Sequence, residues 1–327
     1  MENLEGSTLS SLALASSDSK GRERPEPHDE LMTVFQRDRD RIVHSKAFRR
    51  LAHKTQVFLA PEGDHYRVRL THTLEVTQVA RTIARALALN EDLVEAICMG
   101  HDLGHTPFGH LGEEVVADFL PGFRHNLQSV RIVEVLERLN LTWEVRDGIA
   151  NHTWSMPLPS TLEGQIARYA DRIAYLNHDI DDAERAGVLR EIDLPDETRT
   201  VLGPNHAERV QTMVKDLVSS SEGAAEIKMS EPVFAAMATT RTFLFDRVYL
   251  GRVAPATRDT VQRMLRTLLE HYAGHPETIP PAAEGPGTSN DPTTRSVDYV
   301  AGMTDRFAIR AFEDLIGVPS PAFGALG

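Results

Sequence analysis

The amino-acid sequence predicts an all-α fold. Apolar side chains recur at helical spacing through most of the 327 residues, while strand-like alternation is confined to one short stretch. Hydrophobic residues make up 41% of the chain and charged residues 25%, so there is enough apolar material for a sizeable core. We therefore expect a folded protein, with residues 31–327 forming a single helical domain.

The expected elements follow from periodicity and from helix-breaking residues. Residues 1–30 are rich in Ser, Glu, Pro and Gly and lack periodicity, which predicts a mobile tail. A short hairpin is allowed within 56–69, on either side of the sequence PEGD. Five prolines predict a long surface loop near 275–295. Helical stripes predict helices at 74–87, 93–98 (capped by Asn90), 127–136, 166–180, 206–219, 232–250, 257–272 and 297–316.

Composition excludes several classes of protein. The 35 basic and 48 acidic residues give a formal net charge of −13, which argues against non-specific binding of nucleic acid or anionic membranes by the whole surface. Cys98 is the single cysteine, so a disulfide within one chain and a cysteine zinc site are excluded. No apolar run approaches the ~18 residues of a membrane-spanning helix, and the N-terminus lacks the basic region of a secretory signal. We expect a cytoplasmic protein.

Histidines gather in one part of the chain. Eight of the 14 lie between His44 and His125, a stretch that contains the glycine-broken sequence GHDLGHTPFGHLGE at residues 100–113. His101 and Asp102 close an apolar helix there, and at a helix end neighbouring side chains can converge, whereas inside a helix they diverge by ~100°. Imidazole nitrogen and carboxylate oxygen are ligands for Mn, Fe, Co, Ni or Zn, and less typically for Mg.

A bound metal needs more than two protein ligands. His72 opens a helix upstream, and Asp171 lies on the long helix downstream. Together with His101 and Asp102 they would form a two-His, two-Asp site with positions left for water and a substrate oxygen. The alternative is that each histidine is an ordinary core or surface residue, but the ordered set of four favours a metal site.

The order H…HD…D is the signature of HD-domain phosphohydrolases, and its flanking segments resemble the dGTPase-like deoxynucleoside triphosphate triphosphohydrolases. The resemblance is strong over residues 30–185 and returns over 295–315, and the length is similar to that of the shorter bacterial branch. It implies an HD-domain helical fold with a motif core at 37–185 and a C-terminal helical part at 200–327. The matching segments are RDRDRIVHS (37–45), AFRRL (47–51), HKTQVF (53–58), HDLGH (101–105), YADRIAY (169–175) and DYVAGMTDR (298–306).

The resemblance implies hydrolysis of dGTP or several dNTPs to deoxynucleoside and inorganic triphosphate, which would control the deoxynucleotide pool. The cofactor would be a divalent metal: Mn, Mg, or another transition metal such as Fe, Co or Ni. His110 matches the family's catalytic histidine, a general acid for the leaving 5′ oxygen. Glu113 lies three residues on, where a carboxylate can orient this imidazole and keep it protonated. Alternatively, Glu113 stabilises a helix dipole, and both roles can coexist.

Phosphate binding needs cations on this acidic chain. Arg69 and Arg172 match basic phosphate-contacting positions of related dNTP hydrolases, and His105 and His125 match family histidines that line the phosphate pocket. Seven basic residues also face two aspartates over residues 37–54. This basic segment could attract an anion, but its alternating arginines and aspartates favour salt bridges within the protein.

Three further residues match positions that contact the sugar. The resemblance implies that Tyr175 crowds the 2′ position and so disfavours ribose, that Asp179 binds the 3′ hydroxyl, and that Gln56 contacts the sugar. Asp171, Tyr175 and Asp179 are spaced four residues apart, along one side of the long predicted helix.

The resemblance also implies a homo-oligomer, often a hexamer or tetramer, and some members need a nucleotide at an allosteric site. One alternative is an HD phosphohydrolase of another nucleotide, such as a monophosphate or an alarmone, but those relatives lack the His110–Glu113 pair. A second is a nucleotide- or single-stranded nucleic-acid-binding regulator, which the intact metal and catalytic sets argue against. Trp154, His152 and His178 are interpreted as structural residues.

Overall fold

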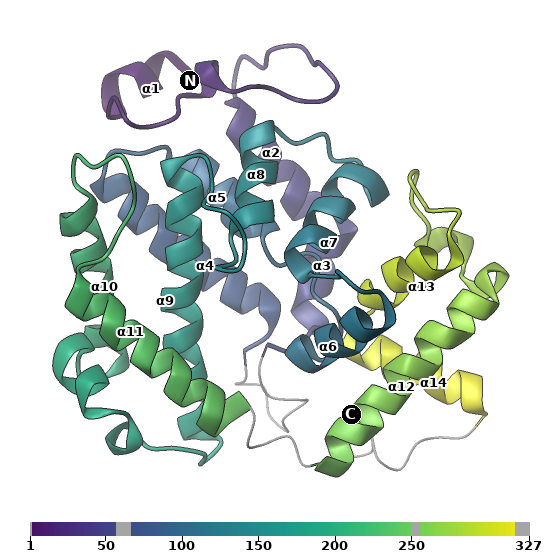
Figure 1. Cartoon of the computed structure of the whole chain (residues 1–327). Helices are drawn as coiled ribbons and strands as arrows, with labels where there is room; N and C mark the ends of the chain where they lie inside the picture. Colours follow the sequence, from purple (N-terminus) through teal and green to yellow (C-terminus); the bar gives the residue numbers. More distant parts are fainter. Residues whose placement is uncertain (1, 57–66, 250–254, 318–327) are drawn as a thin grey trace. The chain divides into compact units, whose positions relative to one another are not determined.

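The computed structural model describes residues 2–56, 67–249 and 255–317, and most of the residues in these ranges lie in helices (Figure 1). No strand occurs in them, and their β-type pairing consists of two isolated bridges, Arg22 with Thr142 and Thr55 with Val68. The all-α prediction is therefore confirmed. The hairpin expected within 56–69 falls largely on residues 57–66, outside the described residues.

The chain forms two compact units, each assembled from three segments. Unit 1 comprises Met1–Arg41, His72–Met99 and Leu141–Arg252, and unit 2 comprises Ile42–Thr71, Gly100–Asn140 and Val253–Gly327. The single helical domain that the sequence predicts over residues 31–327 stays a prediction. The chain passes from one unit to the other several times, so no shift in composition marks the boundaries.

Unit 1 contains the long helix α9, against which α8, α10 and α11 pack. Its interior is made of aliphatic side chains that solvent does not reach, among them Ile83, Leu93, Ile149 and Ile173. The helices are α1 (Glu2–Thr8), α2 (Val34–His44, which ends in unit 2), α4 (Arg69–Ala86, which begins in unit 2), α5 (Glu91–Gly100), α8 (Trp143–Asn151), α9 (Leu162–Arg185), α10 (His206–Ser221) and α11 (Glu231–Leu244).

Unit 2 is organised around α12 (Pro255–Gly274), which packs against α6, α13 and α14. The buried residues of this interface include Phe108, Val116, Leu265, Val300 and Phe312. The other helices of the unit are α3 (Lys46–Arg50), α6 (Gly109–Phe119), α7 (His125–Arg131) with its π-helical continuation η3 (Ile132–Leu136), α13 (Pro292–Ala301) and α14 (Asp305–Ile316).

Helix ends follow the local chemistry of the sequence. The Asn90 side chain accepts hydrogen bonds from the backbone N–H groups of Asp92 (3.1 Å) and Leu93 (3.2 Å), as expected of a cap. The helix predicted over 297–316 is instead two helices, α13 and α14. The break follows Gly302, and the Thr304 hydroxyl caps the second helix by accepting from Phe307 N at 3.3 Å.

The N-terminal segment is not the free tail that composition predicts, because buried carboxylates of unit 1 hold it. Glu163 accepts a hydrogen bond from Leu14 N at 3.0 Å. Glu144 accepts two, from the Ser19 hydroxyl and from Lys20 N, both at 2.7 Å. Polar composition could not reveal acceptors that lie more than a hundred residues away in sequence.

The predicted loop near 275–295 contains two short 3₁₀ turns, Pro276–Thr278 and Pro281–Ala283, before α13 begins. Among the described helices, none combines the length and hydropathy needed to cross a bilayer.

Candidate active site

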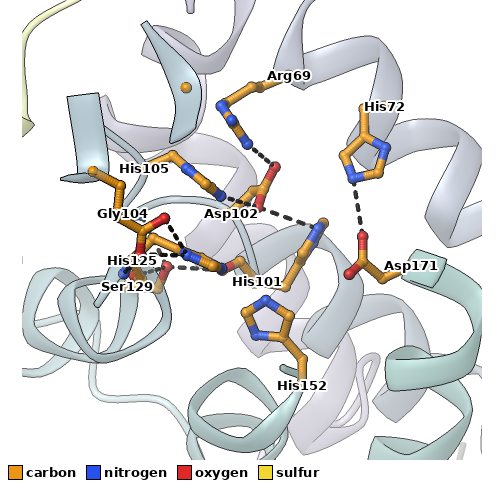
Figure 2. Close-up of polar contacts among 12 residues, drawn as sticks. Arg69, His72, His101, Asp102, Gly104, His105, His125, Ser129, His152 and Asp171 are labelled. Atoms are coloured by element: carbon orange, nitrogen blue, oxygen red, sulfur yellow. Dashed lines mark hydrogen bonds and ion pairs between the residues drawn. The ribbon is translucent and has the colours of Figure 1, made fainter. Parts of the chain in front are cut away.

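In unit 1, two of the predicted metal ligands face each other from α4 and α9. His72 Nε2 lies 3.1 Å from Asp171 Oδ1 (Figure 2), and the side chains are 2% and 21% exposed. The aliphatic packing of both helices fixes the backbone on either side. An imidazole nitrogen and a carboxylate oxygen are thus held together in a largely dry setting.

A second histidine of α9 packs beside this pair. The rings of His72 and His178 meet edge to face at 5.8 Å between centroids. His178 Nε2 lies 2.7 Å from Glu75 Oε2, and Glu75 is on the same helix as His72. His178, held by Glu75, therefore limits how the imidazole of His72 can turn. The sequence analysis interprets His178 as a structural residue. Its position seven residues after Asp171 places both side chains on one face of the helix, which could have indicated that it lies near the site.

Arg172 is held against an aromatic ring. Its guanidinium carbon lies 3.8 Å from the centroid of the Trp154 ring, an attractive cation–π geometry, and it hydrogen-bonds to the Tyr175 hydroxyl. Burial raises the pKa of Tyr175, which keeps that hydroxyl protonated at neutral pH. Asp179 lies one turn further along α9 and is 2% exposed. Trp154, interpreted from sequence as a packing residue, therefore also supports a predicted phosphate ligand.

In unit 2, a group of charged and imidazole side chains surrounds Asp102, just beyond the end of α5. Arg69 NH1 donates to Asp102 Oδ2 at 2.9 Å (Figure 2). His101 Nε2 and His105 Nε2 lie 3.5 and 3.3 Å from Asp102 Oδ1. The four side chains are almost completely buried. The glycine-broken segment thus brings adjacent residues to one carboxylate, as expected.

Two close approaches fix the loop that carries these residues. Gly104 N donates to the Ser129 hydroxyl at 2.8 Å, and that hydroxyl donates to His101 O at 2.8 Å. A Cβ on Gly104 would lie 2.2 Å from Ser129 N, so only glycine fits. Ser129 is a positioning residue that the sequence did not single out, because its partners are 25 and 28 residues away.

His125 and Glu113 form a second close pair in unit 2. Their Nδ1 and Oε1 atoms are 2.9 Å apart, and His125 N also donates to Oε1 at 2.8 Å. The ring of His125 stacks on that of His105, with centroids 3.9 Å apart. Burial opposes both charges, but their mutual attraction and hydrogen bonds raise the pKa of His125 and lower that of Glu113 to about 2. Each member of the pair therefore favours the charged form of the other, the imidazolium of His125 and the carboxylate of Glu113.

Glu113 is nearer to His125 than to His110, its expected partner. His110 Nδ1 lies 4.0 Å from Glu113 Oε2, and the His110 side chain is 72% exposed. Desolvation and the Arg69 guanidinium lower the pKa of His110, although solvent weakens both effects at this exposure. Glu113 thus does not hold a proton on His110 in this arrangement. The His110 ring nevertheless lies near the group, 6.2 Å from that of His105.

Several predicted substrate residues carry buried polar atoms with no hydrogen-bond partner among the described residues. In unit 2 these atoms are Gln56 Oε1, Arg69 Nε and His105 Nδ1. In unit 1, Arg172 Nε is likewise buried without a hydrogen-bond partner among the described residues. Buried polar groups are rarely left unsatisfied in a folded protein unless a ligand or water completes them. The pattern is typical of a polar binding site.

The donor chemistry fits a transition metal. Two atoms bound to one ion at ~2.1 Å lie about 3.0–3.4 Å apart for bond angles between 90° and the tetrahedral angle. The His72–Asp171 separation of 3.1 Å lies within this range, and the His101–Asp102 separation of 3.5 Å lies just above it. Each unit therefore contains one imidazole–carboxylate pair of a kind that suits a divalent cation.

Comparison with known proteins identifies the family. Residues 69–176 match the HD domain, and residues 227–314 match a phosphohydrolase-associated domain. A deoxyguanosinetriphosphate triphosphohydrolase-like protein of Caldanaerobacter subterraneus is 51% identical, covering 98% of this chain and 96% of that protein. A protein of the same description from Clostridium perfringens (strain 13) is 47% identical, covering 96% of each.

Among solved structures, a hypothetical protein from Aquifex aeolicus aligns at a TM-score of 0.48 and 18% identity, covering 88% of this chain and 70% of that one. The curated relatives match almost from end to end, and the HD model spans the histidine and aspartate motifs. The chain is therefore a member of the dGTPase-like family of HD-domain phosphohydrolases.

Proposed function

We propose that this phosphohydrolase cleaves dNTPs, dGTP or several of them, into deoxynucleoside and inorganic triphosphate. The observation that carries the proposal is the buried group around Asp102, in which Arg69 Nε and His105 Nδ1 have no hydrogen-bond partner among the described residues. Gln56 Oε1, also in unit 2, is a third buried atom without such a partner. Guanidinium and imidazole N–H groups suit phosphate oxygens, and an amide oxygen suits a sugar hydroxyl. The names of the curated relatives agree with this substrate class.

We further propose that the two imidazole–carboxylate pairs hold one divalent cation, Mn, Mg, Fe, Co or Ni. The order of the four ligands along the chain and the HD-domain match support a single site. Such a cation would supply an activated water and would neutralise charge at the α-phosphate. The buried environment strengthens these electrostatic effects, because water screens them less.

The chain's own groups would handle the triphosphate and the departing proton. Arg69, Arg172 and the imidazolium of His125 would bind phosphate oxygens. His110 would donate a proton to the 5′ oxygen as its bond to phosphorus breaks. Glu113, hydrogen-bonded to His125, would keep that imidazole charged rather than serving His110 directly.

Selection of deoxyribose would come from α9. The Tyr175 hydroxyl, which is hydrogen-bonded to Arg172, would occupy the space that a 2′ hydroxyl needs. Asp179 would accept from the 3′ hydroxyl, one turn further along the helix. Replacement of Tyr175 by alanine should therefore lower the ratio of kcat/KM for a dNTP to kcat/KM for the matching NTP.

The decisive experiment incubates the purified chain with each dNTP and with Mn²⁺ or Mg²⁺, and separates products by chromatography. We expect deoxynucleoside and inorganic triphosphate in equal amounts, and no turnover after a chelator removes the metal. Release of monophosphate and pyrophosphate would contradict the proposed bond cleavage and would favour another nucleotide hydrolase.

Two variants separate metal binding from proton transfer. Asp102→Ala should lose both metal and turnover, because a ligand and the partner of Arg69 disappear together. His110→Ala should retain metal but lower kcat by roughly 100-fold or more, the usual contribution of a general acid. His275→Ala, an exposed histidine of unit 2, is the matched control. Near-normal turnover of His110→Ala would refute its assignment.

A homo-oligomer, a hexamer or tetramer, and an activating nucleotide are further parts of the proposal, as is a cytoplasmic location. Light scattering coupled to size exclusion would give the stoichiometry. Assays of dNTPs singly and in mixtures would reveal activation, since an activator would raise the rate on a second substrate. Equal rates in both formats would exclude activation by these nucleotides.

A further inference from the structure

The start of α6 is a strained turn. Phe108 and Gly109 both adopt left-handed backbone conformations, with φ of 62° and 58°. A non-glycine residue there costs about 1–2 kcal/mol and persists only when its surroundings enforce it. This turn sets the direction of the helix that carries His110 and Glu113. What enforces it therefore also determines where those side chains lie.

Asp305, at the first position of α14, binds the turn from outside the motif. Its Oδ1 accepts from Phe108 N at 3.1 Å, and its Oδ2 accepts from Thr55 N at 3.0 Å. The residue is 7% exposed, and Thr304 caps the helix beneath it. A fixed, buried carboxylate thus joins two backbone N–H groups that lie 197 and 250 residues away in sequence.

A buried lysine secures the other side of the same loop. Lys54 is 1% exposed, and its ammonium group donates to His105 O and to Ala301 O, the latter at 2.8 Å. Asp305 and Lys54 attract each other electrostatically, so each lessens the cost of burying the other. The loop from His105 to Gly109 is therefore held at both ends by hydrogen bonds to the buried side chains of Lys54 and Asp305, which the proposed chemistry does not use.

The side chain of Phe108 does not by itself fix the turn. It packs in the apolar interface of unit 2 with residues such as Leu265, Val300 and Met303, and such contacts tolerate small rotations. The backbone N–H is different, because a buried donor needs an acceptor in one direction. Asp305 supplies that direction.

We propose that Asp305 is a positioning residue: its two carboxylate oxygens lock the Phe108–Gly109 turn and so aim His110 and Glu113 at the group around Asp102. The inference rests on the proposed function for its kinetic consequence, but its structural part stands on the hydrogen bonds alone. No contact of Asp305 with substrate or metal is required.

The test compares Asp305→Asn with the wild-type chain. Asparagine keeps one accepting oxygen but turns an NH₂ group towards the second backbone donor. We expect kcat to fall roughly 10- to 100-fold, because misplacement of about 1 Å at a reacting group has that effect. KM and Mn²⁺ affinity, measured by calorimetry, should stay within about threefold, since the ligands and the phosphate-binding side chains are unchanged.

Hydrogen exchange supplies a readout that is independent of activity. Amides of residues 106–114 should exchange faster in Asp305→Asn, whereas those of α9 should not. Asp314→Asn, an exposed carboxylate on the same helix, should change neither exchange nor kcat. If Asp305→Asn does not fold, Gly109→Ala strains the same turn with Asp305 intact and should lower kcat in the same way.

The outcomes are separable. Unchanged exchange in residues 106–114, or faster exchange with normal kcat, would overturn the inference. A folded Gly109→Ala with normal kcat would also overturn it. If the wild-type chain hydrolyses no dNTP, the proposed function fails, and the exchange result alone then decides whether Asp305 holds the turn.

Discussion

At the scale of single residues, the pairing of Glu113 with His125 changes the expected distribution of protons. Sequence spacing places Glu113 beside His110, three residues earlier on the same helix. In the folded chain its oxygen lies 2.9 Å from His125 and 4.0 Å from His110. The attraction between a carboxylate and an imidazolium is strongest at short range, so Glu113 raises the pKa of His125, whereas burial and Arg69 lower that of His110.

This pair predicts a pH dependence of stability. Burial alone would raise the pKa of Glu113 from its usual 4.5, but His125 lowers it to about 2. The stabilisation is therefore complete above about pH 4.5 and is lost as pH falls towards 2. The wild-type chain should lose about 2 kcal/mol more unfolding free energy between pH 6 and pH 3 than Glu113→Gln, as measured by urea denaturation.

The same pair predicts an effect on the alkaline side. The pKa of His125 is raised above its usual 6.5, so its share of the stabilisation is present below that pH and is lost as pH rises through the raised value. A Glu113→Gln chain should lack this alkaline loss. If the unfolding free energies of the wild type and the variant changed in parallel with pH, the assignment of this effect to the His125–Glu113 pair would be contradicted.

At the scale of elements, close backbone packing determines where the helices of the motif begin. The start of α6 folds back on the preceding loop so tightly that a Cβ on Gly112 would lie 1.9 Å from Pro107 O. No real side chain can occupy that space, so the backbone would have to move. The helix could not then keep both the left-handed turn before it and its contact with the loop.

We expect Gly112→Ala to destabilise the protein by roughly 2 kcal/mol or more, as for other overpacked sites. Gly274→Ala is the matched control in unit 2, because a Cβ there meets nothing within 4 Å. Thermal denaturation of both variants checks this. A Gly112→Ala chain as stable as the control would show that α6 can shift freely.

The loop before α9 supports a second prediction. Trp154 stacks on Arg172, and Arg168 of the same helix donates to Met156 O at 3.0 Å, which holds that loop against α9. Trp154→Ala should raise KM for dNTP several-fold with a smaller change in kcat, because Arg172 loses its support. Trp154→Phe keeps an aromatic face and should restore most of the affinity. Equal KM for all three chains would exclude this role.

At the scale of the whole molecule, long-range polar contacts decide which segments are ordered. The composition of residues 10–22 predicts a mobile tail. In the structure, carboxylates of α8 and α9 accept hydrogen bonds from this segment. Glu144 and Glu163 are buried, at 1% and 0% exposed, and a buried carboxylate needs hydrogen-bond donors. The segment supplies donors to both, and Asn90 N supplies a further one to Glu163 at 3.1 Å. The segment is thus part of the folded unit.

Glu144→Ala should release this segment. Limited trypsin digestion should then cleave after Lys20 and Arg22 faster than in the wild-type chain, while the core stays resistant. Glu222→Ala, an exposed residue of the same unit, is the control. Unchanged cleavage at these two positions would show that the segment is held by other contacts.

The sequence by itself determined the helical fold and the family, and it supplied the residues that we propose carry the chemistry. Periodicity locates α4, α9, α10 and α12, because helix formation and the apolar stripe are local properties. The HD motif and its flanking segments identify the family, because the side chains that a metal and a phosphate require are restricted in kind and order.

Only the tertiary structure decided how these side chains pair. Glu113 binds His125, Ser129 anchors Gly104, Trp154 supports Arg172, and a carboxylate from α14 binds the turn before α6. The anchoring of the N-terminal segment and the division into two units were likewise decided there. Each depends on atoms that meet across dozens to hundreds of residues, where neither local propensity nor spacing along the chain gives distance or direction.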